Sequence, residues 1–332
     1  MSNFEHTHHA HCESGVVSSM LRHYGLSLSE PMVFGLSNGL NFAYIPFVKI
    51  GGMPLVAYRS IPKSIIKNIK KSLKIEMKLE TFSSKKKGEE RLDELLREGK
   101  IVGAQSSVYW LEYFPPEMRF HFNAHNLLVY GKEGDEYLIS DPVFDKLVRC
   151  HKDSLSKARF VKGVMAPKGL LYYPVNVPKK IDLKPIVKKS IKKTASFMLR
   201  TPVPIAGLRG IKYLAKTIGK LNKKDKRYAK LFLGHIIRMQ EEIGTGGAGF
   251  RFMYASFLQE ASELFGGDKI LEEASKMMLA VGDEWRDFAL MIAKSLKSKK
   301  EIDFKTISQK LLTISENEKE VYKKMLEFKA SL

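Results

Sequence analysis

One ordered set of three residues constrains the fold of this chain more than any other feature. Cys12 begins a helical pattern, His125 begins an apolar strand pattern, and Asp141 directly follows the next strand pattern. A thiol reacts as the thiolate, an adjacent imidazole can accept its proton, and a carboxylate behind the imidazole fixes the tautomer. The sequence therefore predicts a catalytic triad of nucleophile, base and orienting carboxylate, held by one helix and two neighbouring strands.

The residues after Cys12 have the spacing of a helix that ends at Gly25. Apolar residues recur at steps of three and four: Val16, Val17, Met20, Leu21 and Tyr24. A cysteine at a helix N-terminus also gains from the helix dipole, which favours the thiolate. A cysteine helix followed by a histidine strand and an aspartate strand is the order expected of a papain-like enzyme.

Several histidines compete for a role near Cys12. Of His121 and His125, only His125 leads directly into the apolar run 127–130, so we prefer it as the base and expect His121 to line the pocket. A crowded group just before Cys12 could instead indicate a metal site or the remnant of an expression tag: His6, His8, His9 and His11. Its spacing lacks the paired ligands of a zinc site, so we predict no metal.

The other cysteine and the apolar runs indicate the class of protein. Cys150 has no implied histidine or acidic partner and is interpreted as a small buried hydrophobe. Two cysteines, one of them the predicted nucleophile, argue against a disulfide framework. The sequence has no run of eighteen apolar residues and no charged-then-apolar leader, so we expect a cytoplasmic protein.

The sequence pattern changes near residue 176, from mixed strand and helix patterns to helical patterns. A length of 332 residues, 44% of them apolar, allows two domains with hydrophobic cores. We predict an α+β fold: a papain-like domain over 1–175, then an all-α domain over 176–332. In the first we expect irregular structure over 30–44 that leads into a strand, helices at 60–75 and 87–98, and strands at 101–104, 126–131 and 136–140. In the second we expect helices at 185–199, 205–221, 225–243, 248–264, 267–296 and 304–329, with the glycine-rich segment 244–251 as an interhelical turn rather than a phosphate-binding loop.

The net charge of +20 is concentrated in residues 179–230, which hold 17 Lys or Arg and two acidic residues, a net +15. Part of this segment forms a basic amphipathic pattern that includes Lys188, Lys189, Lys192 and Lys193. The pattern fits an ordinary solvated helix face, a docking face for an acidic phosphopantetheine carrier protein, or an anionic lipid surface. No stacking-aromatic motif accompanies the charge, so nucleic acid is not expected.

Taken together, these motifs resemble the butirosin-biosynthesis H-type family, over nearly the whole chain. The resemblance is carried by His11-Cys12 ahead of a helix, by residues 30–44, 109–113, 121–125 and 140–142, and in the second half by 244–251, Phe257-Leu258 and Trp285. The family combines a papain-like cysteine domain with a helical domain. Its type member transfers an acyl group from an acyl-carrier-protein thioester to an amine.

The resemblance implies that Cys12 accepts the acyl group, with His125 as base and Asp141 as its orienter. No cofactor is implied beyond a phosphopantetheine-linked donor on a carrier protein, and the acceptor would be a small amine. The oxyanion would be held by the Cys12 backbone N–H and a second donor, for which Gln105 is a candidate; His11 and His121 are further candidates for the pocket. Relatives tend to carry an aspartate where this chain has residues 105–107 and a proline where it has Glu112, which leaves the acceptor open.

Two other functions remain open from the sequence. The same triad could serve a cysteine amidase or peptidase that uses water as the acceptor. A non-enzymatic carrier-binding or membrane-peripheral protein would use the basic helices alone, although the complete set of Cys12, His125 and Asp141 counts against it. In the transferase, the helical domain would act as a lid or docking domain that keeps water from the acyl-enzyme.

Overall fold

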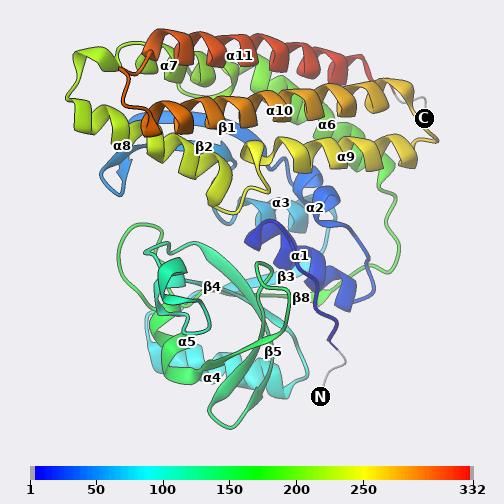
Figure 1. The fold of residues 1–332 in the computed structure, drawn as a ribbon. Helices are drawn as coiled ribbons and strands as arrows, with labels where there is room; N and C mark the ends of the chain where they lie inside the picture. The colour runs from blue at the N-terminus through cyan, green and yellow to red at the C-terminus, as the bar shows by residue number, and fades with distance from the viewer. Residues whose placement is uncertain (1–3, 330–332) are drawn as a thin grey trace. The chain divides into compact units, whose positions relative to one another are not determined.

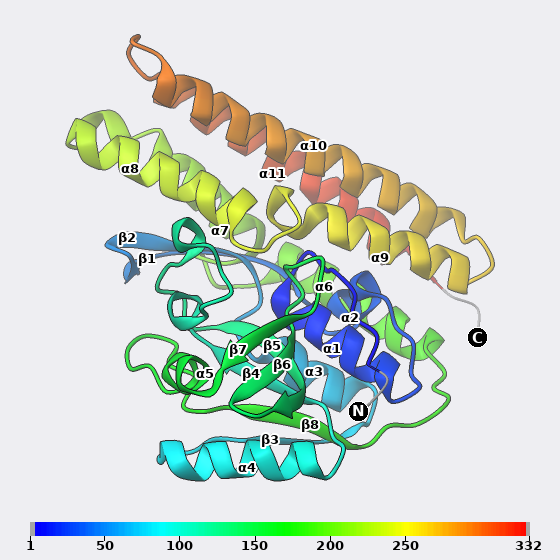
Figure 2. The ribbon, with the colours of Figure 1, turned by 60° about the horizontal axis from the view of Figure 1, so that its bottom comes forward.

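The computed structural model describes residues 4–329, which divide into two compact units (Figures 1 and 2). The first unit comprises the residues up to 33 together with 62–181, and the second comprises 34–61 together with the residues from 182 onward. The predicted boundary at 175/176 assigned 34–61 to the first domain, whereas these residues belong to the second unit. The fold class is as predicted: a mixed helix and sheet unit and a mainly helical unit.

In the described part of the first unit, an antiparallel six-stranded sheet has the order β3-β8-β4-β5-β6-β7. Its strands are β3 (Glu76–Glu80), β4 (Val102–Ser106), β5 (His125–Glu133), β6 (Glu136–Ser140), β7 (Val148–His151) and β8 (Leu171–Asn176). The helices are α1 (Cys12–His23), α3 (Ser64–Ser72), α4 (Lys85–Arg97) and α5 (Lys152–Arg159), and α2 (Glu30–Leu36) crosses from the first unit into the second. Helices α1 and α4 lie on opposite sides of the sheet (Figures 1 and 2).

The alternation of side chains along β4 and β5 divides the sheet into two faces. Ala104 lies opposite Leu127 in the register, and both pack into the hydrophobic core with α4 and α5. Gln105 lies opposite Asn126, and because neighbouring residues of a strand point to opposite faces, this pair faces α1. The apolar face therefore holds the unit together, while the other face carries buried polar groups beneath α1.

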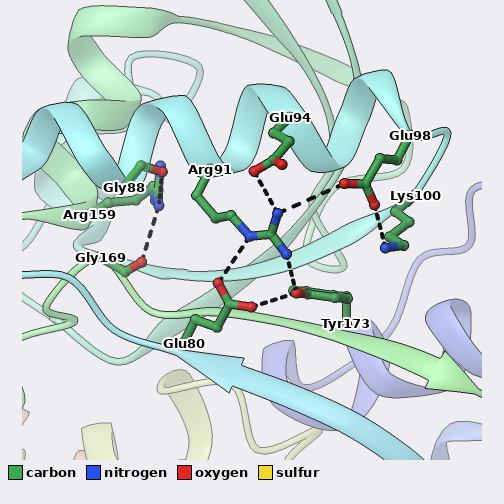
Figure 3. Close-up of polar contacts among 9 residues, drawn as sticks. All are labelled: Glu80, Gly88, Arg91, Glu94, Glu98, Lys100, Arg159, Gly169 and Tyr173. Carbon is green, nitrogen blue, oxygen red and sulfur yellow. Dashed lines mark hydrogen bonds and ion pairs between the residues drawn. The ribbon is translucent and has the colours of Figure 1, made fainter.

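A polar network joins α4 to the edge of the sheet (Figure 3). Arg91 donates from Nε to Glu80 (3.1 Å), from Nη1 to Glu94 (2.6 Å) and from Nη2 to the Tyr173 hydroxyl (2.7 Å). Tyr173 in turn donates to Glu80 (2.5 Å). Since Glu80 and Tyr173 belong to the paired strands β3 and β8, one guanidinium connects the helix to both strands.

Helix α3 is capped by a residue far away in the sequence. Its N-cap residue, Lys63, has a φ of 70° and no capping side chain of its own. The Glu13 carboxylate of α1 instead accepts the backbone N–H groups of Lys63 (3.2 Å), Ile65 (3.0 Å) and Ile66 (3.3 Å). These N–H groups have no partner within a helix, so Glu13 satisfies them and fixes α1 to α3.

The described part of the second unit combines a β-hairpin with helices. The hairpin is β1 (Leu40–Ile50) and β2 (Met53–Arg59), and the helices are α6 (Lys184–Arg200), α7 (Gly207–Ile218), α8 (Lys226–Ile237), α9 (Arg251–Leu264), α10 (Lys269–Lys297) and α11 (Phe304–Glu327). The buried Trp285 of α10 packs against Phe42 and Tyr58 of the hairpin. This aromatic contact explains why 34–61 belong with the helices. No helix within residues 4–329 is long and apolar enough to cross a membrane.

The glycine-rich segment is an interhelical turn, as predicted. The Glu241 carboxylate accepts the backbone N–H of Ala248 (3.1 Å), so a protein carboxylate lies where an anion would bind a phosphate loop. Gly249 has a φ of 55°, and a Cβ at this position would lie 2.3 Å from the Tyr58 ring. The turn thus needs glycine both for its backbone conformation and for its contact with the hairpin.

A buried ion pair follows this turn. Arg251 donates from Nε to Glu318 (2.8 Å) and from Nη1 to the Gly249 carbonyl (2.7 Å), and neither charged side chain is exposed. The Tyr322 hydroxyl donates to the same Glu318 oxygen (2.7 Å). The pair therefore joins α9 to α11 inside the second unit.

We expect Arg251→Met to lower the free energy of unfolding by about 3–5 kcal/mol, because the Glu318 charge would stay buried without its partner. Urea titration followed by circular dichroism measures this loss. Replacing both charges, in Arg251→Met/Glu318→Leu, should recover a large part of it. Lys276→Met, which breaks an exposed ion pair with Glu272, serves as the control and should leave stability unchanged. A loss for Arg251→Met no greater than that for the control would contradict the interpretation.

Candidate active site

Cys12 is the first residue of α1, and the chain before it is held by a buried carboxylate. Glu30 accepts the backbone N–H groups of Ala10 (2.9 Å) and His11 (2.8 Å) and the Ser14 hydroxyl (2.9 Å). His11 is the N-cap of α1 and accepts the Ser14 backbone N–H. Cys12 is only 6% exposed. The thiol thus has a fixed position at a helix N-terminus.

His125 begins β5 and contacts Asp141, which directly follows β6. His125 Nε2 lies 2.7 Å from Asp141 Oδ2. Asp141 is completely buried and also accepts the Tyr113 hydroxyl (2.7 Å) and the backbone N–H of Val143 (3.2 Å). The carboxylate is therefore held by three donors. With Nε2 engaged by Asp141, Nδ1 is the ring nitrogen left to interact with Cys12, which is among the groups that raise the pKa of His125.

The surroundings of His125 keep it protonated. Burial is the largest single influence and lowers the pKa, but the charge and hydrogen bonds of Asp141 and Cys12 outweigh it and raise the pKa of His125 to about 10. The imidazole therefore carries a positive charge at neutral pH. A thiolate beside it is stabilised by that charge, and the imidazolium holds a proton that a leaving group can accept.

Two family models match this chain. The model described as "Butirosin biosynthesis protein H, N-terminal" matches residues 11–142, which contain Cys12, His125 and Asp141. The model described as "Domain of unknown function (DUF4872)" matches residues 153–325, slightly more than half of the chain. The chain belongs to the DUF4872 family and has a butirosin H-type N-terminal domain.

A solved structure is also similar to this chain. A solved structure described as a C39-like peptidase from Bacillus anthracis is similar over 54% of this chain and 98% of its own, with 15% sequence identity and a TM-score of 0.38. No curated protein sequence matches significantly. The cysteine helix of this chain packs on an antiparallel sheet whose neighbouring strands present the histidine and the aspartate, which is the papain-like arrangement. The match to the N-terminal family and the arrangement of these three residues indicate a papain-like cysteine domain.

The histidines before Cys12 of the butirosin H-type domain make separate hydrogen bonds. His6 lies between the Ser140 hydroxyl (2.8 Å) and the Phe144 carbonyl (2.9 Å). His9 contacts the Ser19 hydroxyl (3.1 Å). Within residues 4–329, no group of three or more His, Cys, Asp or Glu side chains is arranged to hold a metal ion.

The remaining predicted pocket residues of the butirosin H-type domain lie in different surroundings. His121 is exposed and stacks on Tyr109, with ring centroids 4.1 Å apart. Tyr109 lines a surface cavity of about 500 Å³ together with Trp110 and Glu112. Gln105 is completely buried, and neither atom of its amide has a hydrogen-bond partner in the described residues. The predicted docking lysines lie on α6 of the second unit, where Lys189, Lys192 and Lys193 are exposed and Lys188 is half-buried.

Four residues of the site are missing from the sequence-based prediction: Glu30, Tyr113, Asn126 and Tyr172. Glu30 and Tyr113 lie within the motifs that carry the family resemblance, but nothing in their spacing indicates which partners they bind. Asn126 follows His125 in β5, and its Nδ2 lies 3.9 Å from the Cys12 sulfur. Adjacency to the predicted base is the signal that could have identified it.

Proposed function

We propose that this protein is an amide-forming acyltransferase. It would take an acyl or peptidyl group from a carrier-protein thioester onto Cys12 and pass that group to an amine. The observation that carries the proposal is that Cys12 lies beside β5, 3.9 Å from Asn126 Nδ2 and next to the buried His125–Asp141 pair, in a domain named for butirosin biosynthesis. Such a triad forms acyl-enzymes, and a biosynthetic setting favours an acceptor other than water.

In the first half-reaction, the Cys12 thiolate attacks the thioester carbonyl and a new sulfur–carbon bond forms. The bond to the phosphopantetheine sulfur then breaks, and the departing thiolate takes the proton from His125. Donor and acyl-enzyme are both thioesters, so this exchange is close to thermoneutral. The proposal therefore needs side chains of this chain and a thioester donor, but no cofactor of its own.

In the second half-reaction, His125 acts as the base. Having lost its proton, the imidazole can accept one from the attacking amine, and Cys12 leaves as the thiolate. Formation of an amide from a thioester is downhill. Asp141 keeps the ring in place in both halves, since its carboxylate holds Nε2.

Product analysis tests this proposal. The enzyme is incubated with acyl thioesters, either free or carrier-bound, with and without a panel of small amines, and the products are identified by liquid chromatography and mass spectrometry. We expect the amide to accumulate when an amine is present, with Cys12→Ala as the inactive control. Free acid as the sole product with every amine would favour the amidase or peptidase alternative.

The exposed lysines of α6 are our proposed docking site for the carrier. Lys189, Lys192 and Lys193 share one exposed face of the helix, in a segment with a net charge of +15. An acidic partner protein is attracted to such a surface, and charged groups at the edge of an interface mainly affect encounter. Lys188 is half-buried and has other interactions, so the test omits it.

We expect reversal of these three charges to glutamate to raise KM for a carrier-bound donor about tenfold, which corresponds to the loss of a few exposed ion pairs. KM for a free pantetheine thioester should stay within about twofold. The matched control reverses Lys85, Lys86 and Lys87, which are exposed on α4 of the first unit and change the net charge equally. Equal effects on both donors, or an equal effect of the control, would contradict docking at α6, and loss of binding to anionic vesicles alone would indicate a lipid surface.

A further inference from the structure

The structure points to Asn126 as the side chain that stabilises the oxyanion when Cys12 attacks a carbonyl. This inference rests on the proposed role of Cys12 as nucleophile. Asn126 is completely buried, and its Nδ2 lies 3.9 Å from the Cys12 sulfur. The carbonyl oxygen of a bound acyl group would lie next to that sulfur, so this amide is a side-chain donor close to the reacting atoms.

Two neighbours fix the orientation of the Asn126 amide. Nδ2 donates to the Ala124 carbonyl (3.1 Å), which would repel the amide oxygen if the group were flipped. Oδ1 accepts the Tyr172 hydroxyl (3.1 Å). Burial, with the nearby Glu13 and Cys12, raises the pKa of Tyr172 well above its ordinary value, so the hydroxyl stays protonated and remains a donor. One of the two Nδ2 hydrogens is thereby used, and the other is directed towards Cys12.

The Tyr172 ring has room beside the sheet because residue 103 is glycine. A Cβ on Gly103 would lie 2.2 Å from the ring, closer than packed atoms come. Gly103 and Tyr172 are opposite one another in the register of β4 and β8. The sheet thus provides a fixed position for the tyrosine that orients Asn126, and a donor held in this way needs no rearrangement during the reaction.

A second donor comes from α1. Cys12 is the first residue of the helix, so its backbone N–H has no acceptor inside the helix. When the thiolate attacks, the sulfur–carbon bond forms and the carbonyl electron pair moves to oxygen. The oxygen would then accept from the Cys12 N–H and from Asn126 Nδ2. When the carbonyl re-forms, the pair returns and the bond to the leaving group breaks.

Gln105 is the other buried amide on this face of the sheet. It lies opposite Asn126 in the β4–β5 register, and both of its polar side-chain atoms lack partners. Asn126, however, is the one whose amide reaches the Cys12 sulfur. We therefore assign the oxyanion donor to Asn126 and not to Gln105.

The test compares two reactions of the same thiol. Acylation of Cys12 by p-nitrophenyl acetate passes through an oxyanion, whereas alkylation by iodoacetamide does not. We expect Asn126→Leu, which has similar volume but no donor, to slow acylation roughly 100-fold. Alkylation should stay within about threefold of the natural protein. Neither reaction involves a carrier or an amine, so an error in the proposed acyl transfer would appear in product analysis and not in this comparison.

Tyr172→Phe provides a second variant, because it keeps the ring and removes only the hydroxyl that orients the amide. We expect a smaller loss of acylation, about tenfold, again with alkylation unchanged. Parallel losses of acylation and alkylation in both variants would mean that Asn126 only supports the structure around Cys12, and this would overturn the inference. Natural acylation rates in Asn126→Leu, with a large loss in Gln105→Leu, would also overturn it and assign the role to Gln105.

Discussion

Replacing Cys12 by alanine should abolish turnover and covalent acylation, whereas Cys150→Ala should change neither. Both thiols are buried, but of the two only Cys12 is among the groups that raise the pKa of His125. Burial among apolar residues, with a smaller contribution from Glu112, raises the pKa of Cys150 to about 12, so this thiol stays protonated and unreactive. The two variants thus remove the same atom from two different surroundings.

The measurement is thioester turnover together with labelling by iodoacetamide at neutral pH. The natural protein and Cys150→Ala should incorporate one label at Cys12 and turn over equally. Residual turnover above the uncatalysed rate in Cys12→Ala would contradict its role as nucleophile. Loss of turnover in a folded Cys150→Ala would show that reactivity does not depend on the contact with His125.

Asp141→Asn should lower kcat by roughly 10³- to 10⁴-fold, as substitution of the orienting carboxylate does in serine proteases. Asparagine keeps the shape of the side chain, but its amide can present a donor to His125 Nε2 and so favour the wrong tautomer. The matched control is Tyr113→Phe, which removes one hydrogen bond to Asp141 and leaves its charge. We expect the control to lose less than about tenfold. Comparable losses in both variants would contradict a role based on the charge of Asp141.

The same substitution should change the titration of His125. In the natural protein, NMR should show the His125 imidazole titrating near pH 10, assigned by its absence in His125→Gln. In Asp141→Asn the midpoint should fall well below 10, because burial, which lowers the pKa, is then opposed by Cys12 and no longer by the carboxylate. A midpoint near 10 in the variant would exclude Asp141 as the cause.

The pKa shift of His125 also determines how the free energy of unfolding depends on pH. Since folding raises the pKa of His125 from 6.5 to about 10, its protonation stabilises the folded state fully below pH 6.5. That contribution is lost as the pH rises through 10. The difference in unfolding free energy between the natural protein and Asp141→Asn should therefore be largest below pH 6.5 and decrease towards pH 10. A difference in unfolding free energy that grows with pH would contradict the raised pKa of His125.

The elements that the sequence predicts well are those with local signals. The helices from α6 to α11 follow amphipathic periodicity, and each expected range overlaps the observed helix. The strands β5 and β6 are marked by apolar runs around the turn at Gly134, which has a φ of 58°. Helix α1 begins at the expected cysteine. In these segments the buried residues recur with the spacing of the helix or strand that they form, so the sequence alone indicates the element.

The structure of segment 30–44 could not be predicted from local sequence patterns. It is expected to be irregular up to a strand, yet it forms α2 and the start of β1. Strand β1 is stabilised by pairing with β2 and by contacts such as that of Phe42 with Trp285 in α10. Strands β3 and β8 likewise depend on each other across almost a hundred residues of sequence. Such pairings are tertiary, so hydrophobic periodicity within one segment cannot indicate them.

The candidate site likewise contains some residues that the sequence predicts and others that it does not. Residue type and order are enough to indicate Cys12, His125 and Asp141, because the chemistry demands a thiol, a base and a carboxylate. The partners that fix them are not predictable in this way. Glu30 and Tyr113 act through contacts whose geometry only the fold defines, and Asn126 depends on the packing of α1 against β5.

Intact-protein mass spectrometry after mixing with acyl thioesters tests the central claim most directly. The natural protein should gain the mass of one acyl group, located by proteolysis to the peptide that contains Cys12, and added amine should remove it as the amide. Cys12→Ala should gain nothing. An acyl group on another residue, the same gain in Cys12→Ala, or no gain with any free or carrier-bound thioester would contradict the proposal that Cys12 carries the acyl group.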